Sequence, residues 1–447
     1  MRSVLPLWLA YGFPLTILKW IWEGLGYGEV PPSVAFYTIR GLMFVVNFVL
    51  EDWALHELLP SARERSQAIM LVASSFVTWT YQMHTFSNSI ETLLVLWSLV
   101  LIRRMREHSE RTMIDCCCAL SFLGVLGTFN RITFPAFLVV PAVQLVPQLF
   151  VKPLRVPIIA LSGLMFLAIA ITADTEYYCS IRPRFRDLYA NAVFTPWNNL
   201  IYNMDPSNLA EHGLHAFWQH AIANLPQLIG PAYPLLFISS RKNTTFWSAI
   251  VGIAVLSCFS HQEPRFLLPT VPLLLSSIRL PQRYARSWIA AWIAFNAFAG
   301  VLFGIYHQGG VVPAQIWISQ QSDVSQVLWW KTYSPPRWLL DGRNSHVITT
   351  DLMGMDADDM VEKMMGSSEC VGVEKGRTLL VAPSSATFLD DLVQPSSRDG
   401  ITLRELWVHR SHIGLDDLDF ADDGIWPTLQ RVIGRRGLIV WQVHRKC

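Results

Sequence analysis

The sequence predicts an α-helical polytopic membrane protein with a small C-terminal α/β domain. Hydrophobic residues make up 52% of the 447 residues and charged residues only 15%, whereas about a quarter of an average soluble domain is charged. Apolar runs near the roughly 20 residues that cross a bilayer recur through the first two-thirds of the chain. Past residue 306 the composition changes to shorter, more polar segments. We therefore expect a membrane domain over 1–305 and an α/β domain over 306–447.

Ten apolar runs are candidate membrane-spanning helices. An earlier run, 4–22, contains two prolines and ends in a cluster of Lys19, Trp20 and Trp22, so we expect it to lie in the membrane interface or to re-enter. The ten candidates lie near 34–58, 67–83, 89–102, 113–129, 133–149, 156–173, 218–238, 245–260, 266–280 and 287–305.

The placement of Lys and Arg predicts how these spans are oriented, because basic loops remain on the cytoplasmic side. The intervening loops and the tail from residue 306 are then expected on the opposite side. A formal net charge of +1 argues against a nucleic acid partner, which needs a concentrated basic face. The five basic loops are 61–67, 103–112, 152–155, 240–243 and 279–286.

The tail alternates short apolar runs with helical patterns. Strands are expected at "HVITTDLM", "RTLLVAPSS" and "GLIVWQVHR", which begin at residues 346, 377 and 437. Helices are expected at "MDADDMVEKMMG" and "WPTLQRVIG", which begin at residues 355 and 426. This alternation predicts a small α/β fold.

The stretch "HQEPRFLLP" places three polar side chains at the start of an apolar run. Pro264 suits the first turn of a helix, where its missing N–H costs nothing. Arg265 in that turn carries a planar donor fork matched to phosphate oxygens, beside the positive end of the helix. Glu263 and His261 position Arg265, or they bind a sugar and move a proton. An interfacial ion pair between Glu263 and Arg265 that touches no ligand is the structural alternative.

Other polar residues gather at the same predicted membrane face. A helix cap, a basic interfacial anchor and an aromatic belt with exposed acids are the alternatives to binding at these three places. His212 and His215 have a metal-binding spacing but no third ligand nearby, so we expect no metal. The candidate cavity residues are Asn88 and Glu91 in "FSNSIET", Asn130 and Arg131 in "FNRITF", and Asp174 and Tyr178 in "DTEYY".

Together these motifs resemble glycosyltransferase family 22, whose lumenal helix start reads H-[KQ]-E-x-R-F. The likeness extends over most of the chain and includes "FNRITFPAF" and "TPWNNLIYN". "HGLH", ending at His215, and "YHQGGVVPAQ" at 306–315 are similar to the branch that adds the fourth mannose of glycosylphosphatidylinositol (GPI) anchors.

This resemblance implies an endoplasmic reticulum enzyme of the GT-C architecture with a lumenal C-terminal domain. It would transfer mannose from dolichol-phosphate-mannose to the third mannose of a GPI precursor, forming an α-1,2 bond with inversion. No metal or other cofactor is implied. Arg265, Glu263 and His261 would hold the donor phosphate, and the residues of the three other motifs would line the cavity.

The sequence departs from the family at its start. Family members carry a His-Pro-Asp-Glu motif in a first lumenal loop, and its acids are the expected general base. No such motif occurs here, so we expect that the first span and this loop are missing from the sequence. Asp174 or Glu176 is the substitute base. Another family 22 mannosyltransferase, a non-catalytic shortened membrane protein and a lipid transporter are the functional alternatives; the absence of internal repeats disfavours the transporter.

Overall fold

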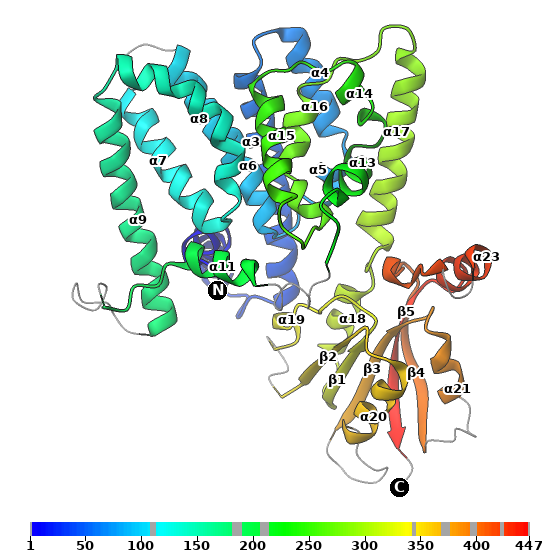
Figure 1. The fold of residues 1–447 in the computed structure, drawn as a ribbon. Coiled ribbons are helices and arrows are strands. Elements are labelled where there is room, and N and C mark those ends of the chain that lie inside the picture. Colours follow the sequence, from blue (N-terminus) through cyan, green and yellow to red (C-terminus); the bar gives the residue numbers. More distant parts are fainter. Residues whose placement is uncertain are drawn as a thin grey trace. The chain divides into compact units, whose positions relative to one another are not determined.

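The computed structural model describes residues 2–107, 113–180, 190–205, 214–341, 346–367, 376–393, 400–420 and 424–445. The chain separates into two compact units (Figure 1). We call Met1–Gly28 with Tyr37–Phe298 the helical unit, and Glu29–Phe36 with Ala299–Cys447 the sheet unit. The sequence-based boundary at 305/306 falls at the end of a π-helix, Leu302–Tyr306.

Long helices form the frame of the helical unit. Two of them, α3 and α17, each contribute one end to the sheet unit. The long helices are α3 (Pro32–Leu58), α6 (Ser87–Glu107), α7 (Met113–Asn130), α8 (Phe134–Val151), α9 (Arg155–Cys179) and α17 (Ala285–Val301). The shorter α-helices are α4 (Ala62–Ala73), α5 (Phe76–Thr80), α11 (Thr195–Met204), α13 (Leu225–Ile229), α14 (Leu235–Ile238), α15 (Thr244–Leu256) and α16 (Thr270–Leu275).

Five helices in the described part of the chain are long and apolar enough to cross a membrane. The expected runs at 34–58, 133–149, 156–173 and 287–305 correspond to four of them. The fifth is the N-terminal run. Of the ten expected spans, four are therefore long and apolar enough, in the described part of the chain, to cross a membrane as single helices. The five are Val4–Gly24, Pro32–Leu58, Phe134–Val151, Arg155–Cys179 and Ala285–Tyr306.

Three expected spans are not continuous helices. Residues 67–83 divide between α4 and α5, where Ser75 caps the new helix by accepting a hydrogen bond from the amide of Val77. Residues 218–238 break into short pieces because prolines interrupt the run and Gly230 has a φ of 43°. Residues 266–280 contain Pro269 and Pro272, and only α16 is α-helical there. The composition predicted the burial of these runs but not their continuity.

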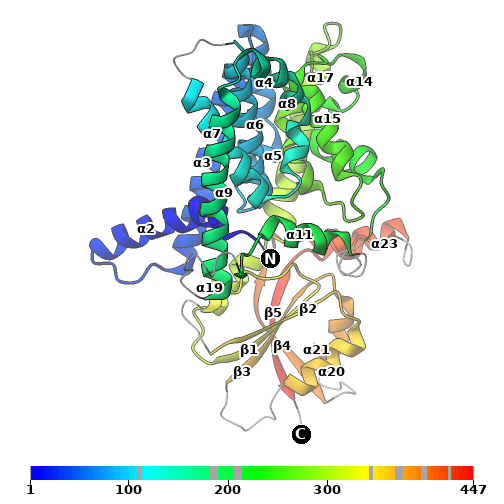
Figure 2. The same ribbon diagram turned by 60° about the vertical axis from the view of Figure 1, so that its left-hand side comes forward.

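The N-terminal run forms one uninterrupted helical rod. It consists of α1 (Val4–Leu7), a π-helical turn (Trp8–Gly12) and α2 (Phe13–Gly24). Figure 2 shows α2 lying crosswise to α7 and α9. No residue of α2 is buried. Trp8 is 51% and Trp20 77% exposed. By length and composition this rod is one of the five helices that could cross a membrane, and its interfacial placement stays a prediction.

A five-stranded mixed sheet forms the core of the sheet unit, in the order β2-β1-β3-β5-β4. The pairs β1–β2 and β1–β3 are parallel, whereas β5 is antiparallel to both β3 and β4. Three strands and the helix near 355 follow the sequence-based expectation, whereas β1 and β4 were not predicted. The strands are β1 (Val324–Trp330), β2 (Ile348–Met353), β3 (Arg377–Pro383), β4 (Ile401–His409) and β5 (Leu438–Arg445).

Helices cover both faces of this sheet. On one face, α18 (Val311–Ile318) and α19 (Trp338–Asp341) share a core with Val327 and Trp329. On the other, α20 (Ala357–Ser367) and α21 (Asp390–Val393) share a core with Leu328 and Trp330. Consecutive residues of β1 thus alternate between two cores, so the strand is buried on both sides. Another short helix, α23 (Ile425–Leu429), precedes β5.

The motif "YHQGGVVPAQ" has a structural role in the sheet unit. A side chain on Gly309 would collide with the carbonyl oxygens of Ile305 and Ser411. The amide of Gly310 donates to Nδ1 of the buried His412 at 3.2 Å. Only glycine permits this close approach of two chain segments, which explains both glycines before α18.

Candidate active site

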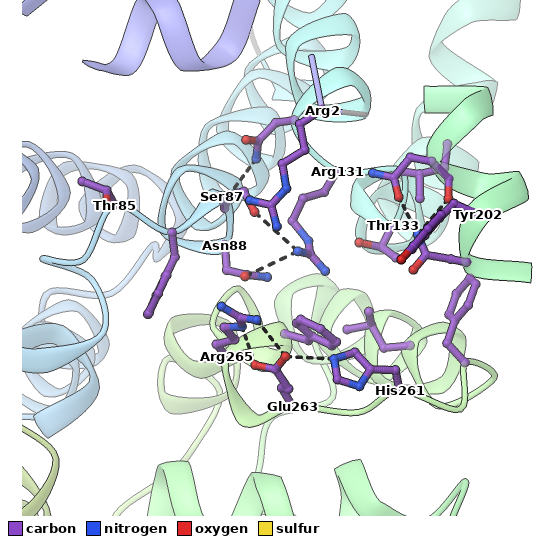
Figure 3. Close-up of a pocket in the computed structure, with 18 residues that line it drawn as sticks. Arg2, Thr85, Ser87, Asn88, Arg131, Thr133, Tyr202, His261, Glu263 and Arg265 are labelled. Atoms are coloured by element: carbon purple, nitrogen blue, oxygen red, sulfur yellow. Dashed lines mark hydrogen bonds and ion pairs between the residues drawn. The ribbon is translucent and has the colours of Figure 1, made fainter. Parts of the chain in front are cut away.

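Four segments of the helical unit, together with Arg2 near the N-terminus, enclose a cavity of about 340 Å³ (Figure 3). They are the start of α6, the turn between α7 and α8, the segment 259–266 and one face of α11. Three of the four carry the cavity or donor-site residues that the sequence predicted. The lining residues are Arg2, Thr85, Phe86, Ser87, Asn88, Asn130, Arg131, Ile132, Thr133, Asn199, Tyr202, Asn203, Leu256, Phe259, His261, Glu263, Arg265 and Phe266.

Arg131 and Glu91 form an ion pair behind the cavity wall. Nε of Arg131 lies 3.0 Å from Oε2 of Glu91, whose side chain is 1% exposed. Thr133 donates to the other oxygen of Glu91 at 3.2 Å, and Asn88 donates to Oε2 at 3.4 Å. Glu91 is therefore not in the lining but holds the residues that are. Its predicted role in the cavity is indirect in this structure.

The turn between α7 and α8 is also tied to α6 directly. Asn130 donates to the carbonyl oxygen of Ser87 at 2.8 Å. The guanidinium of Arg131 lies 4.8 Å from the ring centre of Phe266, so it also packs against the "HQEPRF" segment. Burial lowers the pKa of Arg131; Glu91 opposes this shift, and the nearby charges of Arg2 and Arg265 add to it.

His261, Glu263 and Arg265 form one connected cluster at the opposite wall. Nε of Arg265 lies 2.5 Å from Oε2 of Glu263, and another guanidinium nitrogen of Arg265 donates to Oε1 at 2.7 Å. Nε2 of His261 lies 2.8 Å from the same Oε1. Burial would raise the pKa of Glu263, but the charge of Arg265 and hydrogen bonds from Arg265 and His261 hold it below its ordinary 4.5. Glu263 is therefore an ionised positioning group for Arg265 rather than a proton acceptor at neutral pH.

The helix expected to start at Pro264 is much shorter than predicted. Pro264 occupies its first turn as expected, but the element is a four-residue 3₁₀ helix, Pro264–Leu267. The α-helix begins only at Thr270, because Pro269 and Pro272 interrupt the run. No long helix starts here, so no helix dipole adds to the positive charge at this point. The guanidinium of Arg265 alone supplies that charge.

Side chains next to this cluster, two of them buried, hold the "HQEPR" segment in place. Gln262 is 1% exposed, and its side-chain oxygen accepts from the amide of His220 at 2.9 Å. His215 of "HGLH" donates its amide to Ser260 at 2.7 Å, and its Nδ1 accepts from the amide of Gln262 at 3.3 Å. His212 lies outside the described residues. Among those described, no three His, Cys, Asp or Glu side chains come together as metal ligands.

Asp174 and Tyr178 lie at the end of α9 and anchor the chain rather than line the cavity. The buried carboxylate of Asp174 accepts from the hydroxyl of Ser3 at 3.0 Å, the amide of Val4 at 2.8 Å and the hydroxyl of Thr195 at 2.6 Å. Thr195 begins α11, so one carboxylate joins the N-terminal segment to that helix. Asp174 is absent from the cavity lining.

Tyr178 and Glu176 differ in the same way from their sequence-based roles. The hydroxyl of Tyr178 contacts the backbone of Arg2, whose side chain does reach the cavity. Glu176 is exposed and is absent from the lining. Asp174 and Tyr178 therefore position other residues of the cavity. Neither Asp174 nor Glu176 lies in the cavity lining.

Sequence reasoning missed Arg2 and the polar face of α11. Asn199 and Asn203, one helical turn apart, are joined by a 2.8 Å hydrogen bond from the side chain of Asn203 to the carbonyl of Asn199. Tyr202 lines the cavity beside them (Figure 3). The spacing of amides at i and i+4 within "TPWNNLIYN" was the available signal. No local sequence signal pointed to Arg2, because contacts of the N-terminal segment with the distant Asp174 and Tyr178 determine its position.

The cavity suits an anion that also carries hydroxyl groups. Three arginines, Arg2, Arg131 and Arg265, are among its lining residues, against Glu263 as the only carboxylate among the described lining side chains. Guanidinium groups bind phosphate oxygens with two parallel hydrogen bonds. The amides on α11 and at the α6 start offer donors and acceptors for hydroxyls. The site therefore combines an anion subsite with a polar, sugar-like subsite.

Comparison with known proteins agrees with this chemistry. The sequence model of the Alg9-like mannosyltransferase family matches residues 1–340. GPI mannosyltransferase 4 of Aspergillus oryzae is 47% identical over 99% of this chain and 89% of its own length. The protein of that name from Yarrowia lipolytica is 36% identical over 94% of this chain and 86% of its own. That from Saccharomyces cerevisiae is 32% identical with the same coverage.

Proposed function

The chain belongs to the Alg9-like mannosyltransferase family, and we propose that it transfers mannose from dolichol-phosphate-mannose to the third mannose of a GPI anchor precursor. The reaction forms the α-1,2 bond of the fourth mannose. It takes place at the endoplasmic reticulum membrane, where both lipid substrates are held. The shared name of the three relatives supports the acceptor class. The three arginines at one cavity support a phosphate-bearing donor.

The chemistry is a single displacement at the anomeric carbon of the donor. The acceptor hydroxyl oxygen attacks C1 of the β-linked mannose, the C1–O bond to phosphate breaks, and dolichyl phosphate leaves with the electron pair. The hydroxyl proton passes to a base, and the product is an α-mannoside. Because negative charge grows on the leaving phosphate, fixed cations at that point lower the barrier. The geometry supports Arg265, held by Glu263, in this role.

The remaining residues divide into a donor wall and a sugar wall. Arg131 and Arg2 extend the cationic surface next to Arg265, while His261 orients Glu263. Asn88, Asn130 and the amides on α11 bind hydroxyls of mannose or of the acceptor. Asp174 and Tyr178 place Arg2 and α11 at the cavity. Neither Asp174 nor Glu176 lines the cavity, so the proposal assigns the base to neither.

We propose that the cavity opens to the lumen. The helices support this orientation: α6 begins at the cavity and ends at Arg103, Arg104 and Arg106, and α8 runs from the cavity to Lys152. Basic ends and cavity ends are thus opposite, as the positive-inside rule requires. The six other expected spans then also cross, three of them as broken helices, and the sheet unit is lumenal.

Cysteine accessibility tests this orientation. Lys242→Cys lies in a basic loop and should react with a membrane-impermeant maleimide in sealed microsomes. Ala190→Cys precedes α11 and should react only after detergent opens the vesicles. Equal reactivity of the two sites in sealed vesicles would contradict the topology.

The proposed reaction is tested in membranes from cells that lack the fourth-mannose step. The protein should transfer radiolabelled mannose from dolichol-phosphate-mannose to a GPI precursor with three mannoses. An α-1,2-specific mannosidase should release the label. Label on another acceptor, or a bond that resists this mannosidase, would overturn the assignment. Transfer from GDP-mannose after depletion of dolichol-phosphate-mannose would overturn the donor.

A further inference from the structure

A second cavity, of about 380 Å³, lies in the sheet unit. It is found where the three parallel strands β1, β2 and β3 end, and it is formed by the segments that follow them. Its size is within the range of roughly 300–1,000 Å³ that small-molecule sites occupy. The lining residues are Trp330, Lys331, Gly354, Met355, Asp356, Ala357, Ser385, Ala386, Thr387, Phe388 and Arg431.

The strand order explains why a cavity opens here. β1 lies between β2 and β3, and its connection to β2 includes α19 on one face of the sheet. The connection from β2 to β3 includes α20 on the other face. Segments that leave neighbouring parallel strands toward opposite faces separate and leave a crevice at the carboxyl ends. Ligands of open α/β sheets bind in such crevices.

The backbone at the rim is held in an unusual conformation. Lys331 has a φ of 53° and Met353 a φ of 49°, both in the left-handed region. The amide of Lys331 donates to the carbonyl of Met353 at 2.7 Å, and the indole of Trp330 donates to Met355 at 2.8 Å. Non-glycine residues persist in this region only where surrounding contacts hold them, and they concentrate at binding sites. The ends of β1 and β2 are thus locked together beside the cavity.

Cationic groups outnumber carboxylates among the lining side chains. The lining includes two cationic residues, Lys331 and Arg431, and one carboxylate residue, Asp356. The ammonium of Lys331 lies 5.1 Å from the ring centre of Trp330. No carboxylate of the described residues forms an ion pair with Lys331. The acids Asp358 and Asp359 in the first turn of α20 are exposed and do not line the cavity. The rim therefore keeps a positive charge available for an anion.

The rest of the lining fits a hydroxylated ring. Thr387 is exposed, and Phe388 presents 36% of its surface for packing against a sugar. Ser385 is buried and donates to Oδ2 of Asp417 at 2.8 Å, so its oxygen remains an acceptor. Asp356, before α20, accepts the amide of Met360 with its carbonyl and is the one carboxylate residue among the described lining residues.

We propose that this second cavity binds a phosphorylated hexose. Lys331 binds the phosphate, Asp356 and Thr387 bind ring hydroxyls, and Phe388 packs on the sugar. The proposal concerns only the sheet unit and does not depend on the mannosyl transfer assigned to the helical unit. Free sugar phosphates and glycolipid headgroups share this chemistry.

Saturation-transfer NMR on the whole protein in detergent tests the site, with mannose 6-phosphate as probe and mannose and inorganic phosphate as comparison ligands. Mannose 6-phosphate should bind more tightly than either. Because Lys331→Gln removes a charged hydrogen-bond donor to the phosphate, it should weaken binding about tenfold or more. Lys363→Gln, an exposed lysine on α20 outside the cavity, should leave binding unchanged.

A second pair of variants blocks the cavity without touching charge. A side chain on Gly354 would meet nothing within 4 Å, so Gly354→Trp should fold and fill the cavity. Gly366→Trp, equally unobstructed on α20, is its control. Binding that survives both Lys331→Gln and Gly354→Trp would overturn the proposal. So would binding of mannose or phosphate alone as tight as the phosphorylated sugar.

The helical unit also binds anions in our account, so Arg265→Ala separates the two cavities. Mannose 6-phosphate should bind this variant as it binds the unaltered protein, and loss of binding would overturn the assignment to the sheet unit. Competition by phosphatidylinositol vesicles, but not by phosphatidylcholine vesicles, would identify a lipid headgroup as the source. Absence of competition would identify a free sugar phosphate; both outcomes support the proposed chemistry.

Discussion

The phenol of Tyr178 holds the backbone of Arg2 on both sides. Its hydroxyl donates to the carbonyl of Arg2 at 2.6 Å and accepts from the amide at 3.2 Å, across 176 residues of sequence. The side chain of Arg2 then reaches the cavity beside Arg131 and Arg265. A residue outside the cavity therefore sets the position of one of its three cations.

Removing this hydroxyl should affect donor binding more than turnover. Tyr178→Phe loses hydrogen bonds worth about 0.5–1.5 kcal/mol each, so we expect KM for dolichol-phosphate-mannose to rise about two- to tenfold. The change in kcat should be smaller. Tyr177→Phe is the matched control, because Tyr177 is exposed and adjacent. Equal changes in the two variants would show that Tyr178 does not position Arg2.

Glu91 should be required mainly for stability. Its carboxylate is buried against Arg131, and removing one partner of a buried ion pair leaves an uncompensated charge. We expect Glu91→Gln to lower the free energy of unfolding by about 3 kcal/mol, measured by denaturation in detergent micelles. Glu57→Gln breaks the half-exposed pair with Arg104 and should cost under about 1 kcal/mol. Similar losses would mean that Glu91 is not a buried anchor.

His84 should make the fold acid-sensitive. Its Nδ1 accepts from Arg40 at 2.9 Å, and its ring stacks on Phe86, a lining residue. Burial, assisted by the charge of Arg40, lowers the pKa of His84 from 6.5 to about 3. Below pH 6.5 the unfolded chain therefore binds a proton that the folded protein does not, and stability falls as pH falls toward 3.

Melting temperatures between pH 7 and pH 4.5 measure this effect. The unaltered protein should lose stability across the range, and His84→Gln should lose less. His56→Gln, at an exposed position, should follow the unaltered protein. Parallel curves for the unaltered protein and His84→Gln would contradict the assignment.

The N-terminal helix should lie along the membrane. Positions 8 and 20 are 12 residues apart, which is about 18 Å at 1.5 Å per residue. Spin labels at Trp8→Cys and Trp20→Cys, in a cysteine-depleted background, should report equal depth in the bilayer if the helix is interfacial. A difference in depth of about 18 Å between the two labels would show that the helix crosses the membrane.

The sequence predicted the cavity in part because its polar residues stood at the ends of apolar runs. His261, Glu263 and Arg265 meet Asn88, Asn130 and Arg131 as the shared membrane face implied. Polar side chains at a helix end must be paired or hydrated, so their convergence follows from local sequence.

The rest depended on contacts between distant segments. Asp174 had the features of a sugar ligand in "DTEYY", yet it binds Ser3 and Thr195, 171 and 21 residues away. Glu91 had the features of a cavity residue, but it is not in the lining and forms a buried ion pair with Arg131 behind the cavity wall. Hydropathy also predicted a continuous span at 266–280, whereas the helix is interrupted near Pro269 and Pro272. Hydropathy indicates which residues avoid water and does not indicate whether a helix is continuous.

The most direct test of the account compares two arginines by rate. Arg265→Ala should lower kcat for mannosyl transfer by about 100-fold or more, as expected for a lost charge at a developing anion, and Arg265→Lys should restore part of it. Arg283→Ala, an exposed arginine stacked on Tyr284, should leave the rate unchanged. Loss of activity for Arg265→Ala alone, with both proteins folded, is the predicted result; equal rates for the two alanine variants would contradict the donor phosphate role of Arg265.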